Sequence, residues 1–235
     1  MKIKKPILIN QPGNIGDLIH IMAIAQDYVN RGHEVIIPVP VQLLSIRKNF
    51  PTINFPLINE FPDWYYYENN NNCNEDDKYI LLPLGKSPFW NGDSNRNMLK
   101  KYNILNLSGD MWRNVKITRD YDAENKLFNQ LGLKEGDKYN LINEYYKNTF
   151  EKISISVNTQ NGCKNLYINR IGEYNLFDWL KTMENAQSIH TVGTAIVFLM
   201  DVFNSMPNDM HIYPRGDLGN HGTYDYLLNK KYIYH

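Results

Sequence analysis

An aspartate and two glycines follow the first apolar run of this sequence, and their types and spacing are suited to chemistry. The stretch "QPGNIGD" (residues 11–17) lies between a buried-strand pattern at residues 6–10 and an amphipathic helix pattern that starts at Asp17. Ligands of open α/β sheets bind beyond the carboxyl ends of the strands, where this turn is expected to lie. A carboxylate placed there can act as a general base that accepts a proton from a substrate hydroxyl.

The same turn has two other interpretations. The glycines can form a tight turn in which Asp17 only caps its helix and favours the first turn electrostatically. The turn can also cradle a pyrophosphate, but the dinucleotide fingerprint needs GxGxxG, and the sequence has only GxxG at Gly13 and Gly16. An acidic residue is also missing after the second strand, where Pro38-Val39-Pro40 stands, and no Gly-Lys-Ser/Thr follows to make a Walker loop.

The apolar patterns that position this turn alternate between strand and helix along the whole chain. We predict strands at residues 6–10, 35–37, 79–83, 139–144, 165–170, 188–193 and 210–215, and helices at 17–31, 43–47, 97–102, 123–133, 175–185 and 194–203. The pattern restarts near residue 136, after a polar segment that contains glycine. The expected fold is therefore α/β, with two Rossmann-like domains, residues 1–136 and 137–235, that face a cleft.

Composition limits the class of protein. The 235 residues include 25 basic and 25 acidic side chains and are 43% hydrophobic, which is typical of a soluble globular protein without bulk attraction to polyanions. No apolar run is long enough for a membrane span, and residues 6–10 are too short for the core of a signal peptide. Cys73 and Cys163 suggest neither a disulfide framework nor a zinc site, so a cytoplasmic protein is expected. The polar stretch 68–77 is predicted to be an exposed loop.

Two stretches carry a resemblance to a known family. "GNIGDLIHIMAIAQ" (residues 13–26) resembles the N-terminal motif of the heptosyltransferase-like glycosyltransferases, which are two-domain GT-B enzymes. The resemblance implies that Asp17 is the catalytic base, that His20 matches a histidine of the same motif, and that Gly13, Asn14 and Gly16 form a loop at the cleft. "YNLFDWLKTMENAQSIHTVGTAIVFLMDVF" (residues 174–203) resembles the donor-binding stretch of the family, although "TVGTAI" stands where the family commonly has Asp-Thr-Gly and then histidine.

This resemblance implies a nucleotide-sugar site in the second domain. The helix that starts after Gly193 and Thr194 offers free amides and a positive dipole end to a diphosphate. Neighbouring strand ends are expected to add Asn143, Glu144, Arg170, His190 and Arg215, with the arginines suited to phosphate. Each has a simpler interpretation: solvated arginines, a histidine satisfied within the sheet, and a glutamate that starts a helix. No metal or other cofactor is expected, although Asp120-Tyr121-Asp122 matches the DxD pattern of metal-dependent glycosyltransferases.

The function predicted from these features is transfer of a sugar from a nucleotide-sugar to an acceptor hydroxyl, and the resemblance to the heptosyltransferase-like family implies inversion at the anomeric carbon. The acceptor is either a glycan or a hydroxymethylated DNA base, as in phage-type DNA glycosyltransferases, and DNA would require a basic groove with contributions such as Lys100-Lys101. The aromatic residues 64–67, 89, 90 and 112 offer an acceptor platform or ordinary packing. The alternatives are a non-catalytic nucleotide- or sugar-binding protein of the same fold, and an unrelated α/β enzyme that binds phosphate at residues 13–17.

Overall fold

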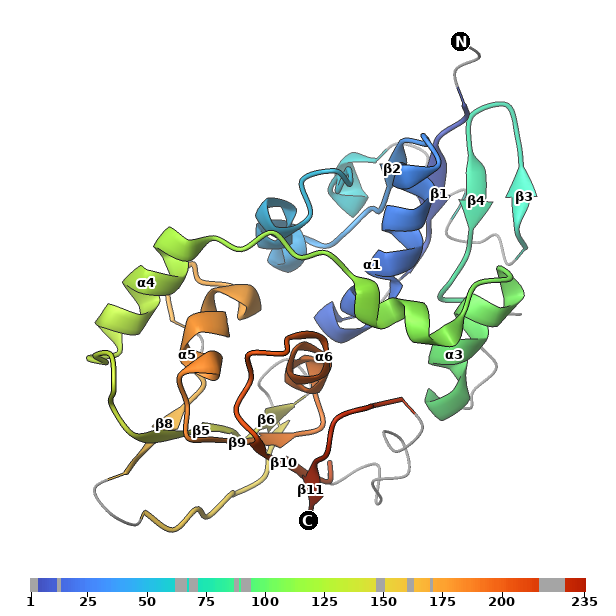
Figure 1. Ribbon diagram of the computed structural model, residues 1–235. Coiled ribbons are helices and arrows are strands. Elements are labelled where there is room, and N and C mark those ends of the chain that lie inside the picture. Colours follow the sequence, from blue (N-terminus) through green and yellow to red (C-terminus); the bar gives the residue numbers. More distant parts are fainter. Residues whose placement is uncertain are drawn as a thin grey trace. The chain divides into compact units, whose positions relative to one another are not determined.

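The computed structural model is mixed α/β, as expected, and forms two compact units, Met1–Thr118 and Arg119–His235 (Figure 1). It describes residues 4–11, 14–61, 67, 72–86, 89, 94–146, 151–159, 163–169, 171–215 and 227–235. The predicted site residues Gly13 and Arg170, and most of the aromatic residues at 64–67 and 90, lie outside these ranges.

The first unit is built on a four-stranded sheet in the order β2-β1-β4-β3. Its strands are β1 (Ile7–Ile9), β2 (Val35–Ile36), β3 (Asn74–Glu75) and β4 (Ile80–Leu82). Strand β1 runs parallel to both β2 and β4, which confirms the predicted strand–helix–strand unit at the start of the chain. All three β1 side chains are buried, as its uniformly apolar sequence predicts for a central parallel strand.

The helices of the first unit are α1 (Ile15–Asn30), η1 (Val41–Asn49), η2 (Ile58–Glu60), α3 (Ser94–Ile104) and η3 (Gly109–Asn114). Helix α1 ends where the sequence predicts: Gly32 has a φ of +84° and its amide donates to the Val29 carbonyl at 2.8 Å. The helix predicted at residues 43–47 is a 3₁₀ helix. Helix α1 packs against β2 and against η3 (Figure 1).

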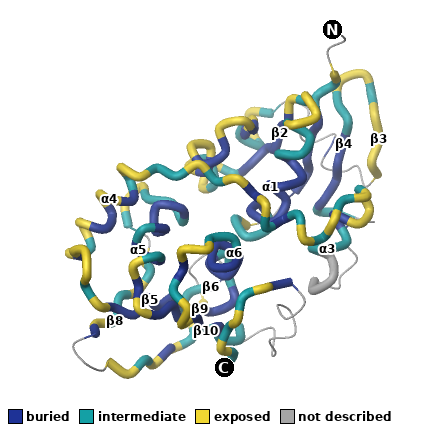
Figure 2. Tube along the Cα trace, viewed as in Figure 1, coloured by how far each residue is buried: buried dark blue, intermediate teal, exposed yellow. Residues whose placement is uncertain are grey.

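The second unit contains a five-stranded parallel sheet in the order β11-β10-β9-β5-β8. Its strands are β5 (Tyr139–Asn143), β8 (Lys164–Tyr167), β9 (Ser188–Val192), β10 (Asp209–Tyr213) and β11 (Ile233–Tyr234), and a separate hairpin joins β6 (Tyr145–Tyr146) and β7 (Glu151–Lys152). Strands β5 and β9 lie in the interior of the sheet and are buried along their whole length (Figure 2).

The second unit begins earlier in the chain than the sequence suggests. Its helices are α4 (Tyr121–Gln130), η4 (Leu176–Trp179), α5 (Leu180–Glu184) and α6 (Ala195–Val202), and α4 packs against η4 and α5. Arg119, which precedes α4, donates from Nη1 to Glu184 Oε1 at 2.7 Å. The division after Thr118 therefore differs from the boundary predicted after residue 136, because α4 is bound to the second unit by these contacts.

None of the helices in the described ranges is both long and apolar enough to cross a membrane. The interior of each unit is formed by its own sheet and by the helices packed on it, with residues of β1, α1, β5, β9 and α6 among those that are fully buried. Both sheets thus present a carboxyl edge at which the predicted site residues can be located.

Candidate functional site

Asp17 lies in the first turn of α1, close to the carboxyl end of β1. Its Oδ2 accepts the backbone amide of Asn14 at 3.0 Å, which is half of a capping box at the start of the helix. The side chain is partly exposed. An ionised carboxylate has more acceptor positions than one hydrogen bond uses, so the cap fixes its orientation and leaves capacity to accept a proton. The capping role and the predicted role as a base are therefore compatible.

A lysine that the sequence did not single out as a site residue lies beside this turn. Lys101, in α3, has 0% of its surface exposed, and its Nζ donates to Gln11 Oε1 at 2.5 Å. Gln11 is the second residue after β1. Burial lowers the pKa of Lys101 to about 8, and the negative charge of Asp17 opposes that shift.

The burial of Lys101 corrects one expectation, because Lys100-Lys101 was considered as part of a basic surface patch. The helical spacing gives only a weak sign of this burial, because Lys101 is three residues after the apolar Met98, which is itself only partly buried.

His20, the second predicted catalytic residue, lies in the core of the first unit. Its ring stacks on Trp112 with 5.5 Å between centroids and meets the edge of Tyr102 at 5.2 Å. Burial lowers its pKa well below the usual value, and the charges of Lys101 and Arg113 lower it further. His20 is therefore neutral at physiological pH and fully enclosed, and the geometry favours packing over proton transfer. Trp112, considered as part of an acceptor platform, is buried with it.

In the second unit, Asn143 ties together three segments at the carboxyl edge of the sheet. Its Nδ2 donates to Thr191 Oγ1 at 3.0 Å, to Thr194 Oγ1 at 3.3 Å and to the Tyr145 carbonyl at 3.3 Å. Thr194 is the N-cap residue of α6, and the amide of Gly193 donates to the Tyr213 carbonyl at 3.2 Å. The predicted residues Asn143, Gly193 and Thr194 therefore meet at the N-terminus of α6.

Two further predicted donor residues follow β5 and β10. The Arg215 guanidinium lies over the Tyr146 ring, 5.6 Å from its centroid, which places a cation on the β6 segment that follows β5. Glu144 Oε1 accepts the amide of Ile155 at 2.9 Å, and the Glu144 carbonyl accepts the amide of Ile153 at 3.1 Å. Glu144 thus holds the segment after β7 in place through two hydrogen bonds, which is a structural role that the sequence did not indicate.

His190 lies inside the sheet, in the middle of β9. Ser188 Oγ donates to Asn140 Oδ1 at 2.8 Å and lies 2.9 Å from His190 Nε2, so the single hydroxyl proton is used and Nε2 carries the hydrogen between them. Nδ1 then accepts from the Tyr213 hydroxyl at 3.2 Å. Burial lowers the pKa of His190 to about 4, followed by the effect of His211. This neutral histidine, satisfied within the sheet, matches the simpler of the two interpretations.

The DxD match at residues 120–122 has a structural explanation. Asp120 is the N-cap residue of α4, and its Oδ1 accepts the amide of Ala123 at 3.0 Å. Within the described ranges, no group of three histidine, cysteine, aspartate or glutamate side chains is arranged to hold a metal ion.

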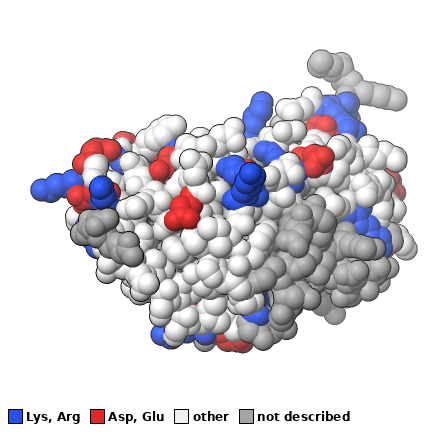
Figure 3. Space-filling model, turned by 60° about the horizontal axis from the view of Figure 1, so that its bottom comes forward, with Lys and Arg blue, Asp and Glu red and all other residues white. Residues whose placement is uncertain are grey.

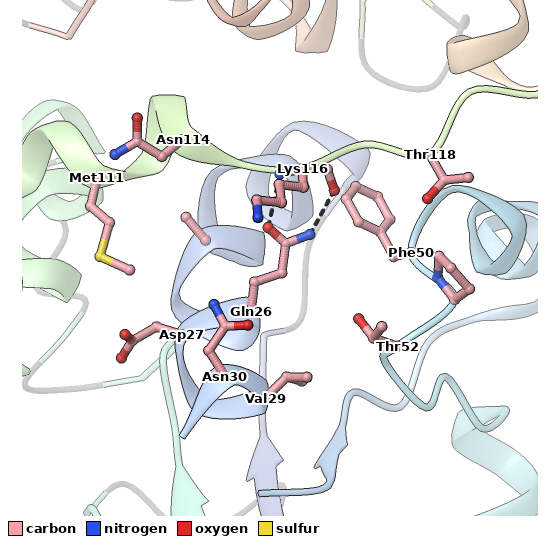
Figure 4. Close-up of a pocket in the computed structure, with 12 residues that line it drawn as sticks. Gln26, Asp27, Val29, Asn30, Phe50, Thr52, Met111, Asn114, Lys116 and Thr118 are labelled. Carbon is pink, nitrogen blue, oxygen red and sulfur yellow. Dashed lines mark hydrogen bonds between the residues drawn. The ribbon is translucent and has the colours of Figure 1, made fainter. Parts of the chain in front are cut away.

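A pocket of about 410 Å³ lies elsewhere in the first unit (Figure 4). It is lined by the C-terminal half of α1, by residues 50–52 and by the segment 111–118. Gln26 holds the segment 111–118 in place with two hydrogen bonds. Its Nε2 donates to the Lys116 carbonyl at 2.6 Å, and its Oε1 accepts from the Lys116 amide at 2.9 Å. Asp17 is at the opposite end of α1 and does not line this pocket.

Comparison with known proteins agrees with the fold that the sequence resemblance implied. No family model matches the chain, and no curated protein sequence matches it. The structure is similar to that of the glycosyl transferase family 9 protein from Veillonella parvula DSM 2008, with a TM-score of 0.55 and 11% identity over 100% of this chain and 87% of that chain.

It is also similar to the structure of the E. coli ADP-heptose lps heptosyltransferase II, with a TM-score of 0.52 and 10% identity over 97% of this chain and 89% of that chain. At such identities the likeness establishes the fold. The chain therefore has the α/β fold of these glycosyltransferase structures along nearly its whole length.

Proposed function

We propose that this protein is a glycosyltransferase that moves a sugar from a nucleotide-sugar donor to an acceptor hydroxyl, with the two units acting as the Rossmann-like domains of a GT-B enzyme. The observation that carries the proposal is the fold shared with two glycosyltransferase structures over nearly the whole chain. The placement of Asp17 supports it, since a partly exposed carboxylate stands close to the carboxyl end of β1, where open α/β sheets bind ligands.

Asp17 is the proposed general base. Its carboxylate is oriented by the Asn14 amide and accepts the proton of the acceptor hydroxyl while that oxygen attacks the anomeric carbon. The bond from the anomeric carbon to the diphosphate breaks on the opposite face, so one displacement inverts the configuration. His20 supports this step only by filling the core behind α1.

The second unit is proposed to bind the donor. The amides at the N-terminus of α6 and the Arg215 guanidinium supply positive charge for the diphosphate that leaves, so we propose that transfer needs no metal ion. Asn143 holds the Thr194 cap of α6 in place through its hydrogen bond of 3.3 Å. Glu144 and His190 are left out of this assignment because their polar atoms are used within the unit.

A glycan fits the proposed acceptor better than DNA does. Binding to DNA relies on lysine and arginine side chains that neutralise several phosphates. Lys101 is buried, and the described residues on the face in Figure 3 show acidic and basic side chains interspersed. We also propose a cytoplasmic location, because Cys73 and Cys163 are free thiols.

Donor binding is tested by melting the protein with UDP-, GDP-, ADP-, CMP- and dTDP-linked sugars. A ligand that binds only the native state stabilises it by about 2.7 kcal/mol at a concentration of 100 times its Kd. We expect one nucleotide class to raise the melting temperature, and Arg215→Met to weaken that shift while Lys116→Met, a change in the first unit, leaves it intact. Absence of a shift with every sugar nucleotide would contradict the proposal. A shift without any sugar transfer would support the binding-protein alternative.

A further inference from the structure

Lys101 is a buried cation whose position suggests a role beyond packing. We propose that Lys101 is a positioning residue of the Asp17 site: its ammonium holds Gln11 at the end of β1 and supplies positive charge beside the catalytic carboxylate. This inference rests on the proposed function, because it assigns Lys101 a part in the step that Asp17 performs.

The first argument is the cost of placing an ammonium in this position. Lys101 has 0% exposure, and its Nζ donates to the side-chain oxygen of Gln11 at 2.5 Å. Taking an ammonium out of water is unfavourable by several kcal/mol. A methionine would fill a similar volume without that cost. A buried charged side chain is therefore a candidate functional residue, because active sites commonly contain buried charged groups.

The second argument is what α3 joins together. Lys101 reaches the segment after β1, and the next residue, Tyr102, donates from its hydroxyl to the His20 carbonyl in α1. Two consecutive side chains of α3 therefore bind the segment that precedes Asp17 and the helix that contains it. Movement of α3 or loss of the Lys101 contact would change the position of Gln11 relative to the first turn of α1.

The third argument is the charge around Lys101. Asp17 of α1 is the acidic group that acts on it, while Tyr102 of α3 is held protonated by its burial. His20 of α1 is kept neutral by burial and by the positive charges of Lys101 and of Arg113 in η3. Among these groups, Lys101 therefore supplies the positive charge that interacts with the Asp17 carboxylate.

The proposal predicts a particular dependence of sugar transfer on pH. The pKa of Lys101 is lowered to about 8, so the side chain is charged at neutral pH and loses its charge just above it. Removing the proton weakens the charge-assisted hydrogen bond to Gln11 and removes the positive charge beside Asp17. Sugar transfer should therefore decline on the alkaline side with a midpoint near pH 8.

The test follows release of the nucleotide from the five sugar nucleotides named above, from about pH 6 to pH 10. The wild type should lose turnover with a midpoint near pH 8. Lys101→Met should reduce kcat by about 10²-fold, as misplaced catalytic groups do, with an unchanged KM for the donor and no transition near pH 8. Lys101→Arg, which keeps the charge, should retain more activity and show no decline near that pH. The adjacent, partly exposed Lys100→Met is the matched control and should behave as the wild type.

The outcomes separate this inference from the proposed function. A wild-type profile without a decline near pH 8, or a Lys101→Met variant with wild-type kcat and profile, overturns the inference and leaves the glycosyltransferase proposal standing. If Lys101→Met does not fold, Lys101→Arg decides, because an unchanged transition near pH 8 in that variant would show that another group causes it. If no sugar nucleotide is turned over by the wild type, both proposals are overturned.

Discussion

Lys101 shows at the scale of one residue how burial and charge act against each other. Its pKa is about 8 in the folded protein, against 10.5 for an ordinary lysine, and burial is the main cause. Between these two values the unfolded chain binds a proton that the folded chain does not. The free energy of unfolding must therefore rise with pH in that window as far as Lys101 is concerned.

The expected size of this effect is about 1.4 kcal/mol per pH unit, or about 3 kcal/mol over the whole window. Buried tyrosines act in the opposite direction near pH 10, so the wild type should be compared with Lys101→Met at each pH. The stability of the wild type should increase relative to the variant from about pH 8 upward, as measured by urea unfolding. A constant difference between the two proteins would show that Lys101 is not a buried cation.

The sequence placed Asp17 correctly but not its neighbours. The short apolar strand, the turn and the helix are local patterns, and they put Asp17 in the first turn of α1, as the structure shows. The burial of His20 and Lys101 depends on contacts with residues far along the chain, such as the Tyr102 hydroxyl on the His20 carbonyl. Local patterns do not reveal such contacts, so the burial of His20 and Lys101 could not be predicted from the sequence.

At the scale of elements, the attachment of α4 depends on a buried ion pair. Glu124 in α4 has a side chain that is 1% exposed, and it accepts from Arg119 Nε at 2.9 Å and from the Lys181 amide at 3.0 Å. Arg119 also binds Glu184 at 2.7 Å, and the hydrogen bond with Glu124 is the main reason that the pKa of Arg119 is raised.

Arg119→Met should lower the free energy of unfolding of the second unit by about 3 to 5 kcal/mol, because it leaves the Glu124 carboxylate buried without its partner. Arg119→Met combined with Glu124→Gln should recover part of this loss by removing the charge. The pair of the exposed Arg31 with the partly exposed Asp27 is the control, and Arg31→Met should cost no more than about 1 kcal/mol. Equal effects of the two arginine variants in denaturant unfolding would contradict this account of α4.

Apolar strands were predicted, including the short edge strand β2, whereas the polar edge strand β3 was not. Strands β1 and β4 are apolar and lie inside their sheet, and each appears where the sequence indicates, as do β5 and β9, which also carry polar residues. Strand β3 has two exposed polar residues and lies in the stretch predicted to be a loop. It is held by backbone pairing with β4, which leaves no mark in the hydrophobic pattern.

At the scale of the molecule, the two units imply a specific place to divide the chain. The fragment 119–235 contains α4 together with the sheet on which its partners pack, whereas 137–235 lacks α4. We expect the first fragment to unfold cooperatively in denaturant and to show dispersed amide resonances. The shorter fragment should expose the face of η4 and α5 that α4 covers, and should be much less stable. Similar folding of both fragments would favour the boundary after residue 136.

The central claim is that Asp17 acts as the base in sugar transfer, and release of nucleotide from a sugar nucleotide measures it most directly. Asp17→Asn should reduce kcat by about 10²- to 10⁴-fold, the usual contribution of a general base, without changing the shift in melting temperature caused by the donor. Asp27→Asn, on the same helix but in the separate pocket, is the matched control and should keep wild-type turnover. Full activity of Asp17→Asn would contradict the account.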